Sequence, residues 1–453
     1  MFAKKVTESK KWLENKLKNS SDVKNDSIST TNFKVSVMYI SSICKSDTIY
    51  QYIINPAFKT DTLSDYETYL RSFPGCTEPK DNQEALDKML TGSVVIFLKS
   101  KLFVFEAKNV QSGYVSDANV EISILGPQDA LVEKLSTNIN LIRHRYHSER
   151  LSIENKIIGK LSQTNVAIAY DQSIADDSVI TDVKKKLSEI DVDILQSAGQ
   201  LHQLLTNKKW SLFPTLLITE RPDRIVKNIS EGKVVIIFET SPFALIIPSV
   251  FFDFFSSMDD IYQLPGVGRF LSFLRYMGVF IATLLPGFYV AVASYNPEIF
   301  RVQLALSIAG SRATVPYPSY LEILFMLFMM EFLIEASIRL PKTVGSAATT
   351  VGGLILGQAA TEAGLVSNIM IIIVAAVAIA NFVIPINAMG FAIRVVKYPI
   401  LLISTLFGLT GLAISFIGLV LYLANQRSFG TSYFRFFEID KPPNKKNKES
   451  TTS

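Results

Sequence analysis

Three glutamates interrupt an apolar, Leu/Met/Phe-rich stretch at residues 320–338: Glu322, Glu331 and Glu335. Glu331 and Glu335 are one helical turn apart, and Arg339 follows Glu335 at i+4, a spacing that favours ion pairs along one side of a helix. Charged groups at bilayer depth cost about 2.5 to 3.5 kcal/mol on insertion scales, so these side chains must be paired or hydrated. The basic residues within reach are Arg339, Lys342 and Arg312. We favour structural pairing, and a vestibule that conducts ions is the alternative.

A second group of residues shares one face of the Gly-, Ala- and Thr-rich stretch at 344–364. Its members are Val344, Ala348, Val351, Ile355, Gln358 and Glu362. The face is apolar for most of its length and polar at one end, as expected of a helix that gates a channel by dewetting. We therefore predict a pore-lining helix with Gln358 and Glu362 near a mouth that attracts cations. The opposing side offers small residues for close helix packing: Gly345, Thr349, Gly352 and Gly353. The alternative is a small-residue helix packed inside a bundle without a pore.

Four charged residues before position 263 are candidates for coupling or subunit contact: Glu220, Arg221, Arg143 and Arg145. Thr219 or Glu220 is predicted to cap a helix that begins near Pro222, with a surface salt bridge as the simplest role for this turn. Arg143 and Arg145 end a predicted linker helix, where a solvated basic face is favoured over an anion site.

Catalytic signals are weak. The three histidines (His144, His147 and His202) lack metal-binding spacing, and the chain has no nucleophile elbow or Walker loop. Cys44 and Cys76 are predicted to be inert thiols, because two cysteines without a CxxC motif form neither a disulfide framework nor a metal site. We predict no enzyme activity, no cofactor and no metal.

Charge is distributed unevenly along the 453 residues. Residues 276–425 carry 11 charged side chains among 150, about 7%, whereas the other 303 residues carry 75, about 25%. This excludes a purely soluble enzyme, a disordered chain and a small disulfide scaffold. The net charge of +4 is too small to indicate nucleic-acid binding. The pattern predicts a soluble region followed by a membrane region.

The soluble region contains an internal duplication. Each copy has one β-type run, a helical stretch and then a hairpin-like pair of runs; the runs are 35–40, 93–98 and 102–107, then 165–171, 233–238 and 243–248. We predict two related α/β subdomains on the cytoplasmic side, followed by a bundle of four to six membrane helices. The expected boundaries are a flexible polar leader at 1–32, subdomains at 33–150 and 151–262, a membrane domain at 263–437 and a basic tail at 438–453.

Four stretches of the membrane region are long enough to span a bilayer: 276–295, 320–338, 367–384 and 399–425. Basic residues precede the first and follow the last, which favours two cytoplasmic ends and an even number of crossings. With four full spans and a re-entrant fifth helix, Arg394 and Lys397 would face outward. The start of the chain is charged and lacks the apolar core of a signal peptide.

Motifs over residues 33–437 resemble the A subunits of GerA-type germinant receptors from endospore-forming bacteria. The soluble motifs are GPQDALVEKLSTNINLIRHRY (126–146), FPTLLITERPDRIV (213–226) and EGKVVIIFETSPFALIIPSVFFDFF (231–255). The membrane motifs are LLPGFYVAVASYNPEIF (284–300), VPYPSYLEILFMLFMMEFLIEASIRLP (315–341) and GQAATEAGLVSNIMIIIV (357–374), followed by RSFGTSYF (427–434). The chain departs from the family pattern at Leu125, where an Arg is common, and at Ser337, where a Gly is common.

The resemblance implies a multi-pass protein of the inner spore membrane. It implies two partners, a transporter-like B subunit that holds the nutrient and a C subunit that is a lipoprotein. It also implies a homo-oligomeric ring whose membrane helices form a cation channel opened by nutrient binding. Two alternatives remain open: a paralogue of the stage V sporulation AF type, without nutrient-binding partners of its own, and a secondary transporter.

Overall fold

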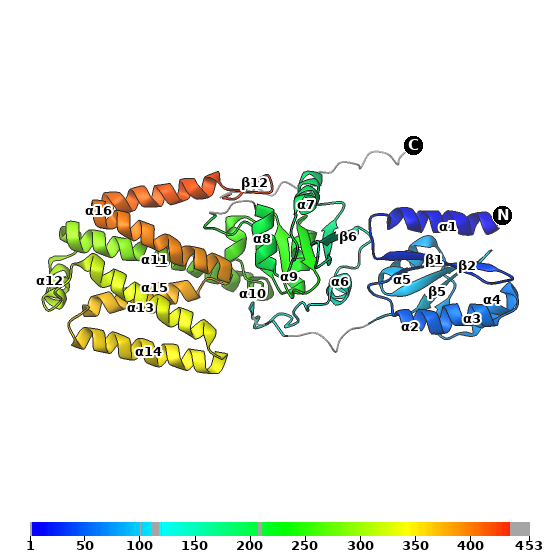
Figure 1. Cartoon of the computed structure of the whole chain (residues 1–453), viewed down its shortest axis with the longest axis horizontal. Helices are drawn as coiled ribbons and strands as arrows, with labels where there is room; N and C mark the ends of the chain where they lie inside the picture. The colour runs from blue at the N-terminus through cyan, green and yellow to red at the C-terminus, as the bar shows by residue number, and fades with distance from the viewer. Residues whose placement is uncertain (1, 100, 110–116, 119, 207–210, 435–453) are drawn as a thin grey trace.

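The computed structural model describes residues 2–99, 101–109, 117–118, 120–206 and 211–434. The predicted basic tail at 438–453 lies outside these residues. Figure 1 shows two α/β subdomains followed by a group of long helices. The described chain therefore has the predicted order of soluble and helical parts.

The first subdomain is a five-stranded antiparallel sheet with helices packed on it, in the strand order β1-β2-β4-β5-β3. Its elements are α1 (Phe2–Lys16), β1 (Val23–Ser29), β2 (Lys34–Ile40), α2 (Ser46–Ile49), the π-helical turn η1 (Tyr50–Ile54), α3 (Asn55–Lys59), α4 (Leu63–Ser72), β3 (Cys76–Thr77), α5 (Asn82–Leu90), β4 (Ser93–Phe97) and β5 (Leu102–Glu106). All five residues of β4 are buried, which explains its continuous apolar sequence.

The second subdomain repeats this order as β6-β7-β9-β10-β8, again with antiparallel neighbours. Its elements are α6 (Leu135–Arg143), β6 (Leu151–Ile158), β7 (Thr164–Asp171), α7 (Asp177–Glu189), α8 (Ala198–Thr206), β8 (Leu217–Thr219), α9 (Pro222–Ser230), β9 (Val234–Phe238) and β10 (Ala244–Ile247). The identical strand order confirms the duplication predicted from the sequence.

Two boundary expectations are wrong. The predicted flexible leader at 1–32 contains α1 and β1. Leu13 of α1 and Leu17 directly after it are buried in the first core, and β1 pairs with β2 along its whole length. β1 is polar because it is an edge strand, in which Ile28 is buried and the other residues are exposed or half-buried. Helix α6, expected to close the first subdomain, packs in the core of the second through Leu135, Ile139 and Ile142.

The helical region begins after two short elements, η2 (Phe251–Phe255) and α10 (Asp259–Tyr262). Its elements are α11 (Pro265–Tyr295), η3 (Pro297–Ile299), α12 (Val302–Arg312), α13 (Ser319–Arg339), α14 (Lys342–Glu362), α15 (Asn368–Phe382) and α16 (Asn387–Asn425). Among the described residues, α11 and α16 are long and apolar enough to cross a membrane, and α15 is a shorter apolar helix. The four predicted spans overlap α11, α13, α15 and α16.

Helix α16 is interrupted at Gly408, whose φ of 60° and ψ of −140° are not helical. A Cβ at this position would lie 3.1 Å from the Tyr295 ring, so both the backbone angles and the space require glycine. The Tyr295 hydroxyl donates hydrogen bonds to the carbonyls of Thr405 at 2.5 Å and Leu406 at 3.4 Å, directly before the break. The two halves of α16 fold back on each other at the end far from the α/β subdomains (Figure 1).

The chain returns from α16 to the second subdomain. A small hairpin of β11 (Arg427–Ser428) and β12 (Thr431–Ser432) leads to Tyr433, which is completely buried. The Tyr433 hydroxyl donates to the Pro214 carbonyl at 2.7 Å, and the Ser428 hydroxyl donates to the Thr215 carbonyl at 2.7 Å. The second subdomain therefore holds both the start of α11 and the segment that follows α16.

Candidate functional site: a helix face, buried ion pairs and a polar junction

The predicted pore face lies on α14 and is open in the single chain. Val344, Val351 and Ile355 have exposed fractions of 53%, 55% and 59%, and Gln358 and Glu362 are also exposed. The side chain of Ala348 lies outside the described residues. In Figure 1, α14 lies at the edge of the helical region rather than at its centre. A helix in this position cannot surround a path within one chain.

A neighbouring side of α14, about 80° to 100° around the helix from this face, packs closely on α13 through two glycines. A Cβ at Gly345 would lie 2.7 Å from the Ser337 carbonyl oxygen, and one at Gly352 would lie 3.1 Å from Leu333. Larger residues at these positions would push the two helices apart. Gly353 was expected to take part in the same packing, but a Cβ there would meet no other atom of the described residues within 4 Å.

Glu331 of α13 is paired with two cations of α16, Arg394 and Lys397, that were not among its expected partners. Lys397, only 1% exposed, donates to Glu331 Oε1 at 2.8 Å, and Arg394 donates to Oε2 through Nε at 2.8 Å. Arg394 and Lys397 therefore bind α16 to α13, and the side of the membrane on which they lie stays a prediction. The partners lie 63 and 66 positions from Glu331, beyond any helical spacing.

The other two glutamates pair as the structural interpretation expects. Arg339 donates to Glu335 at 2.7 Å on an exposed surface, and the Nε of Arg312 lies 3.6 Å from the buried Glu322 carboxylate. The Ser367 amide, at the N-terminus of α15, also donates to Glu322 at 2.6 Å. The side chain of Lys342 lies outside the described residues. Each glutamate thus has a cationic partner within the chain.

A polar network joins the second subdomain to the start of α11. It is built around an extended segment at residues 120–128, which we call the strap and which runs between the two subdomains past α9 and α10. Ser123 donates to Asp259 Oδ1 at 2.6 Å, and the Ile124 amide donates to the same oxygen at 3.1 Å. Asp259 begins α10, which ends three residues before α11. The strap is therefore attached to the chain just before the first long apolar helix.

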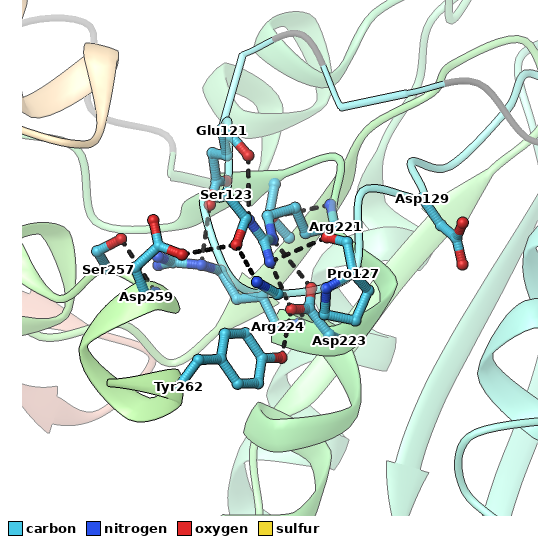
Figure 2. A network of polar contacts seen from close by, with 12 residues as sticks. Glu121, Ser123, Pro127, Asp129, Arg221, Asp223, Arg224, Ser257, Asp259 and Tyr262 are labelled. Carbon is cyan, nitrogen blue, oxygen red and sulfur yellow. Dashed lines mark hydrogen bonds and ion pairs between the residues drawn. The ribbon is translucent and has the colours of Figure 1, made fainter. Parts of the chain in front are cut away.

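Arg221 and Asp223 form the centre of this network, as Figure 2 shows. Arg221, 2% exposed, donates to Asp223 at 2.6 Å and 3.0 Å and also to the strap carbonyls of Glu121 and Pro127. Tyr262 of α10 donates to Asp223 at 2.6 Å. Asp223 thus connects α9, α10 and, through Arg221, the strap.

The network also shifts the acidity of its members. Burial favours the neutral form of Asp223, but the hydrogen bonds from Arg221 and Tyr262 outweigh it and lower the pKa of Asp223. Burial, with the Asp223 hydrogen bond, raises the pKa of Tyr262 to about 12. Burial raises the pKa of Glu121 although Arg224, 2.9 Å away, opposes the shift. At neutral pH Asp223 is therefore a firmly ionised acceptor and Tyr262 a donor.

The predicted helix cap and surface salt bridge at this turn are wrong, whereas coupling or subunit contact through Glu220 and Arg221 stays a prediction. No side chain caps α9: its N-cap is Arg221, and Glu220 instead accepts hydrogen bonds from the strap amides of Val120 and Glu121. The ion pair of Arg221 is buried rather than on the surface. Both residues hold the strap, a contact invisible in sequence because its partners lie about 100 positions apart.

The chain is similar to known proteins over most of its length. A family model described as Bacillus/Clostridium GerA spore germination protein matches residues 11–448. The chain belongs to the GerA family. Family membership supports a role in spore germination. Among the described residues of this GerA-family chain, no group of three or more His, Cys, Asp or Glu side chains could hold a metal ion.

Curated GerA relatives match most of the chain. It is 33% identical over 407 residues to spore germination protein KA of Bacillus subtilis (strain 168), covering 88% of this chain and 75% of the relative. It is 32% identical to spore germination protein B1 of the same strain, covering 88% and 84%, and 33% identical to spore germination protein GerLA of Bacillus cereus, covering 88% and 83%. A crystal structure of the N-terminal domain of the A subunit of the Bacillus megaterium spore germinant receptor GerK3 matches 54% of this chain and 95% of its own, with 22% identity and a TM-score of 0.43.

Arg143 of this GerA-family chain is buried between the two subdomains, contrary to the predicted solvated face. It is 1% exposed and donates to Asp22 at 2.8 Å and 3.0 Å and to the Ser20 hydroxyl at 3.1 Å. Beside it, the Ser21 amide donates to the Ile153 carbonyl at 2.7 Å. Arg145, by contrast, is half-exposed and pairs with Asp129 just beyond the strap. Arg143 therefore joins the repeats, and Arg145 anchors the segment between them.

Proposed function

We propose that this chain is the A subunit of a spore germinant receptor and forms, as a homo-oligomer, a nutrient-gated ion channel in the inner spore membrane. Its partners in this proposal are a transporter-like B subunit that binds the nutrient and a lipoprotein C subunit. The proposal builds on GerA family membership and on the exposed face of α14.

The proposed topology has six crossings: α11, α13, α14, α15 and the two halves of α16 on either side of Gly408. An even number is supported by the contacts of Tyr433 and Ser428 with the second subdomain, because the chain then leaves and re-enters on the same side. The six-crossing arrangement also puts the break of α16 at the far side of the bilayer. The pairing of Glu331 with Arg394 and Lys397 lowers the cost of holding these charges inside a membrane.

The α14 face is the observation that carries the channel proposal. Val344, Val351 and Ile355 are exposed in the single chain, whereas Gly345 and Gly352 on the neighbouring side fix α14 closely to α13. Copies of the chain arranged around an axis would turn these apolar side chains toward one another and leave Gln358 and Glu362 at one mouth. A narrow apolar path excludes water until its wall moves apart.

The polar junction supplies a physical route from the soluble part to this gate. Asp223 and Asp259 tie α9 and the strap to α10, and Arg275 in α11 donates to Asp260 Oδ1 at 2.9 Å. A displacement of the second subdomain therefore acts directly on the first turns of α11. In the proposed receptor, nutrient binding by the partner subunit would produce that displacement.

Substitution of the apolar face tests the channel proposal. Val351→Ala or Ile355→Ala removes two or three methyl-sized groups from each subunit, about 1.6 to 2.4 kcal/mol of apolar free energy. We expect spores carrying either variant to lose dormancy and germinate without nutrient, and the purified protein to leak ions from loaded liposomes at least roughly tenfold faster.

Leu354→Ala is the matched control. Leu354 is 66% exposed on the same helix but points about 80° away from the centre of the proposed pore face. It should leave dormancy and ion retention unchanged. Normal dormancy and tight liposomes in both face variants would contradict the assignment of α14 as the gate.

A further inference from the structure

The strap turns polar side chains toward the protein and aliphatic side chains toward the surface. Glu121 and Ser123 point inward, where they meet Arg224 and Asp259, whereas Ile122 and Ile124 point outward with exposed fractions of 72% and 78%. Leu125 follows with 64%. Most extended segments on a protein surface bury the apolar side and expose the polar one. Here a buried ionic network holds three large aliphatic side chains in an exposed position.

The strap is attached to the chain close to the start of the first long apolar helix. The bond from the Ile124 amide to Asp259 places the strap against α10, and a Cβ on Gly126 would overlap the ring of Tyr262. Directly after α10, Leu264 is 75% exposed, and α11 begins at Pro265. Figure 1 shows the strap beside α10, where the second subdomain meets the helical region. Exposed apolar side chains therefore lie both on the strap and directly before α11, on two segments joined by the Ile124–Asp259 hydrogen bond.

The charges around this surface favour a lipid bilayer as its occupant. Glu121 and Asp259 are turned inward and engaged with partners, and Asp129, just beyond the strap, is half-exposed and paired with Arg145. Arg269, in the first turns of α11, is exposed. The outward-facing strap side chains Ile122, Ile124 and Leu125 are uncharged and aliphatic. Aliphatic side chains without polar tips suit the disordered boundary between headgroups and acyl chains.

We propose that the strap is a membrane-interface anchor, in which Ile122, Ile124 and Leu125 insert shallowly into the leaflet that α11 enters. The internal network of Arg221, Asp223 and Asp259 holds these side chains at that depth. The anchor would couple the second subdomain to the bilayer surface as well as to α11. This inference rests on the proposed passage of α11 through the membrane.

Site-specific labelling of the full chain in liposomes tests the anchor. Both native cysteines are first removed by Cys44→Ala and Cys76→Ala. Single cysteines are then introduced at three sites: Ile124→Cys in the strap, Phe280→Cys on the exposed side of α11 and Lys185→Cys on α7. Each cysteine is labelled with an environment-sensitive fluorophore. Lipids carry a nitroxide quencher either near the headgroup or deep in the acyl chain. We expect the label at 124 to be blue-shifted and quenched mainly by the shallow nitroxide, the label at 280 to be quenched mainly by the deep one, and the label at 185 to be quenched by neither.

The other outcomes separate the two ideas. A label at 124 that stays unquenched while the label at 280 is quenched would overturn the anchor and leave the proposed membrane passage intact. An unquenched label at 280 would contradict the membrane passage itself. A blue shift at 124 without quenching, which disappears when the protein is diluted in lipid, would show that a second copy of the chain covers the strap, and the lipid anchor would be wrong.

Discussion

Glu331→Gln probes the buried charges between α13 and α16. Glu331 is the carboxylate shared by Arg394 and Lys397, so the group carries one negative and two positive charges. The substitution keeps the size of the side chain but leaves two cations without a counter-charge. Removing one partner of a buried ion pair costs about 3 to 5 kcal/mol. We expect the lower half of this range, because Arg394 is 15% exposed and lies over the Phe391 ring at 5.4 Å.

The imbalance of charge predicts an unusual order of effects. Lys397→Met removes the surplus cation and leaves Glu331 balanced by Arg394, so it should cost less than Glu331→Gln although Lys397 is only 1% exposed. In the Glu331→Gln background, the same Lys397→Met change should restore stability, because it removes one of two unpaired buried cations.

Thermal unfolding of the four proteins in one detergent, followed by fluorescence, measures this cycle. Because unfolding of membrane proteins is often irreversible, rates at one temperature are compared as well as midpoints. Glu335→Gln is the matched control: its pair with Arg339 is exposed, and such pairs contribute about 0 to 1 kcal/mol. The reasoning is refuted if Lys397→Met costs as much as Glu331→Gln and fails to rescue it.

Two further predictions concern the soluble part. Asp259→Ala removes the acceptor of the hydrogen bonds from Ser123 and Ile124, a loss of about 1 to 3 kcal/mol. Hydrogen exchange of the strap amides should therefore become about 5- to 150-fold faster, while the β4 amides, the internal reference, stay unchanged. Unchanged exchange of the strap amides would contradict the attachment of the strap to Asp259. Burial raises the pKa of Cys44 to about 12 and that of Cys76 to about 11, so native alkylation, followed by intact mass, should be slow at pH 8 and accelerate only as the pH approaches 11. The pKa of Cys44 in the folded chain is raised above its ordinary value of 9.0. The contribution of the neutral Cys44 thiol to stability is therefore complete below pH 9 and is lost as the pH rises through about 12. Rapid alkylation of Cys44 in the folded chain at pH 8 would contradict its burial.

The duplicated α/β architecture was predictable because its central strands are buried on both faces. Strands β4 and β9 consist entirely of buried residues, so their apolar runs stand out in the sequence. The edge strand β1 does not stand out, because its sequence VKNDSIS is almost wholly polar. Only its pairing with β2 shows that the start of the chain is part of the sheet.

The candidate sites were predictable only where they depend on local spacing. The α14 face follows from helical periodicity, and the Glu335–Arg339 pair follows from the i+4 rule. The cations that pair with Glu331, the partners of Arg143 and the strap carbonyls that bind Arg221 lie between 63 and 123 positions away, so no pattern within a single helix could reveal them. The alternation of Val120 to Ile124 was a usable signal, but alternation alone does not say which side of a segment faces inward.

The return of the chain through Tyr433 has a mechanical consequence. The second subdomain holds the helical region at the beginning of α11 and just past the end of α16, whereas α13 is joined to α16 through Glu331. A rotation of that subdomain would therefore displace α11 and α16 together. The α13–α14 pair would move with α16 through the ion pairs of Glu331, so a rotation of the second subdomain would also displace α14, which has no direct link to it through these ion pairs.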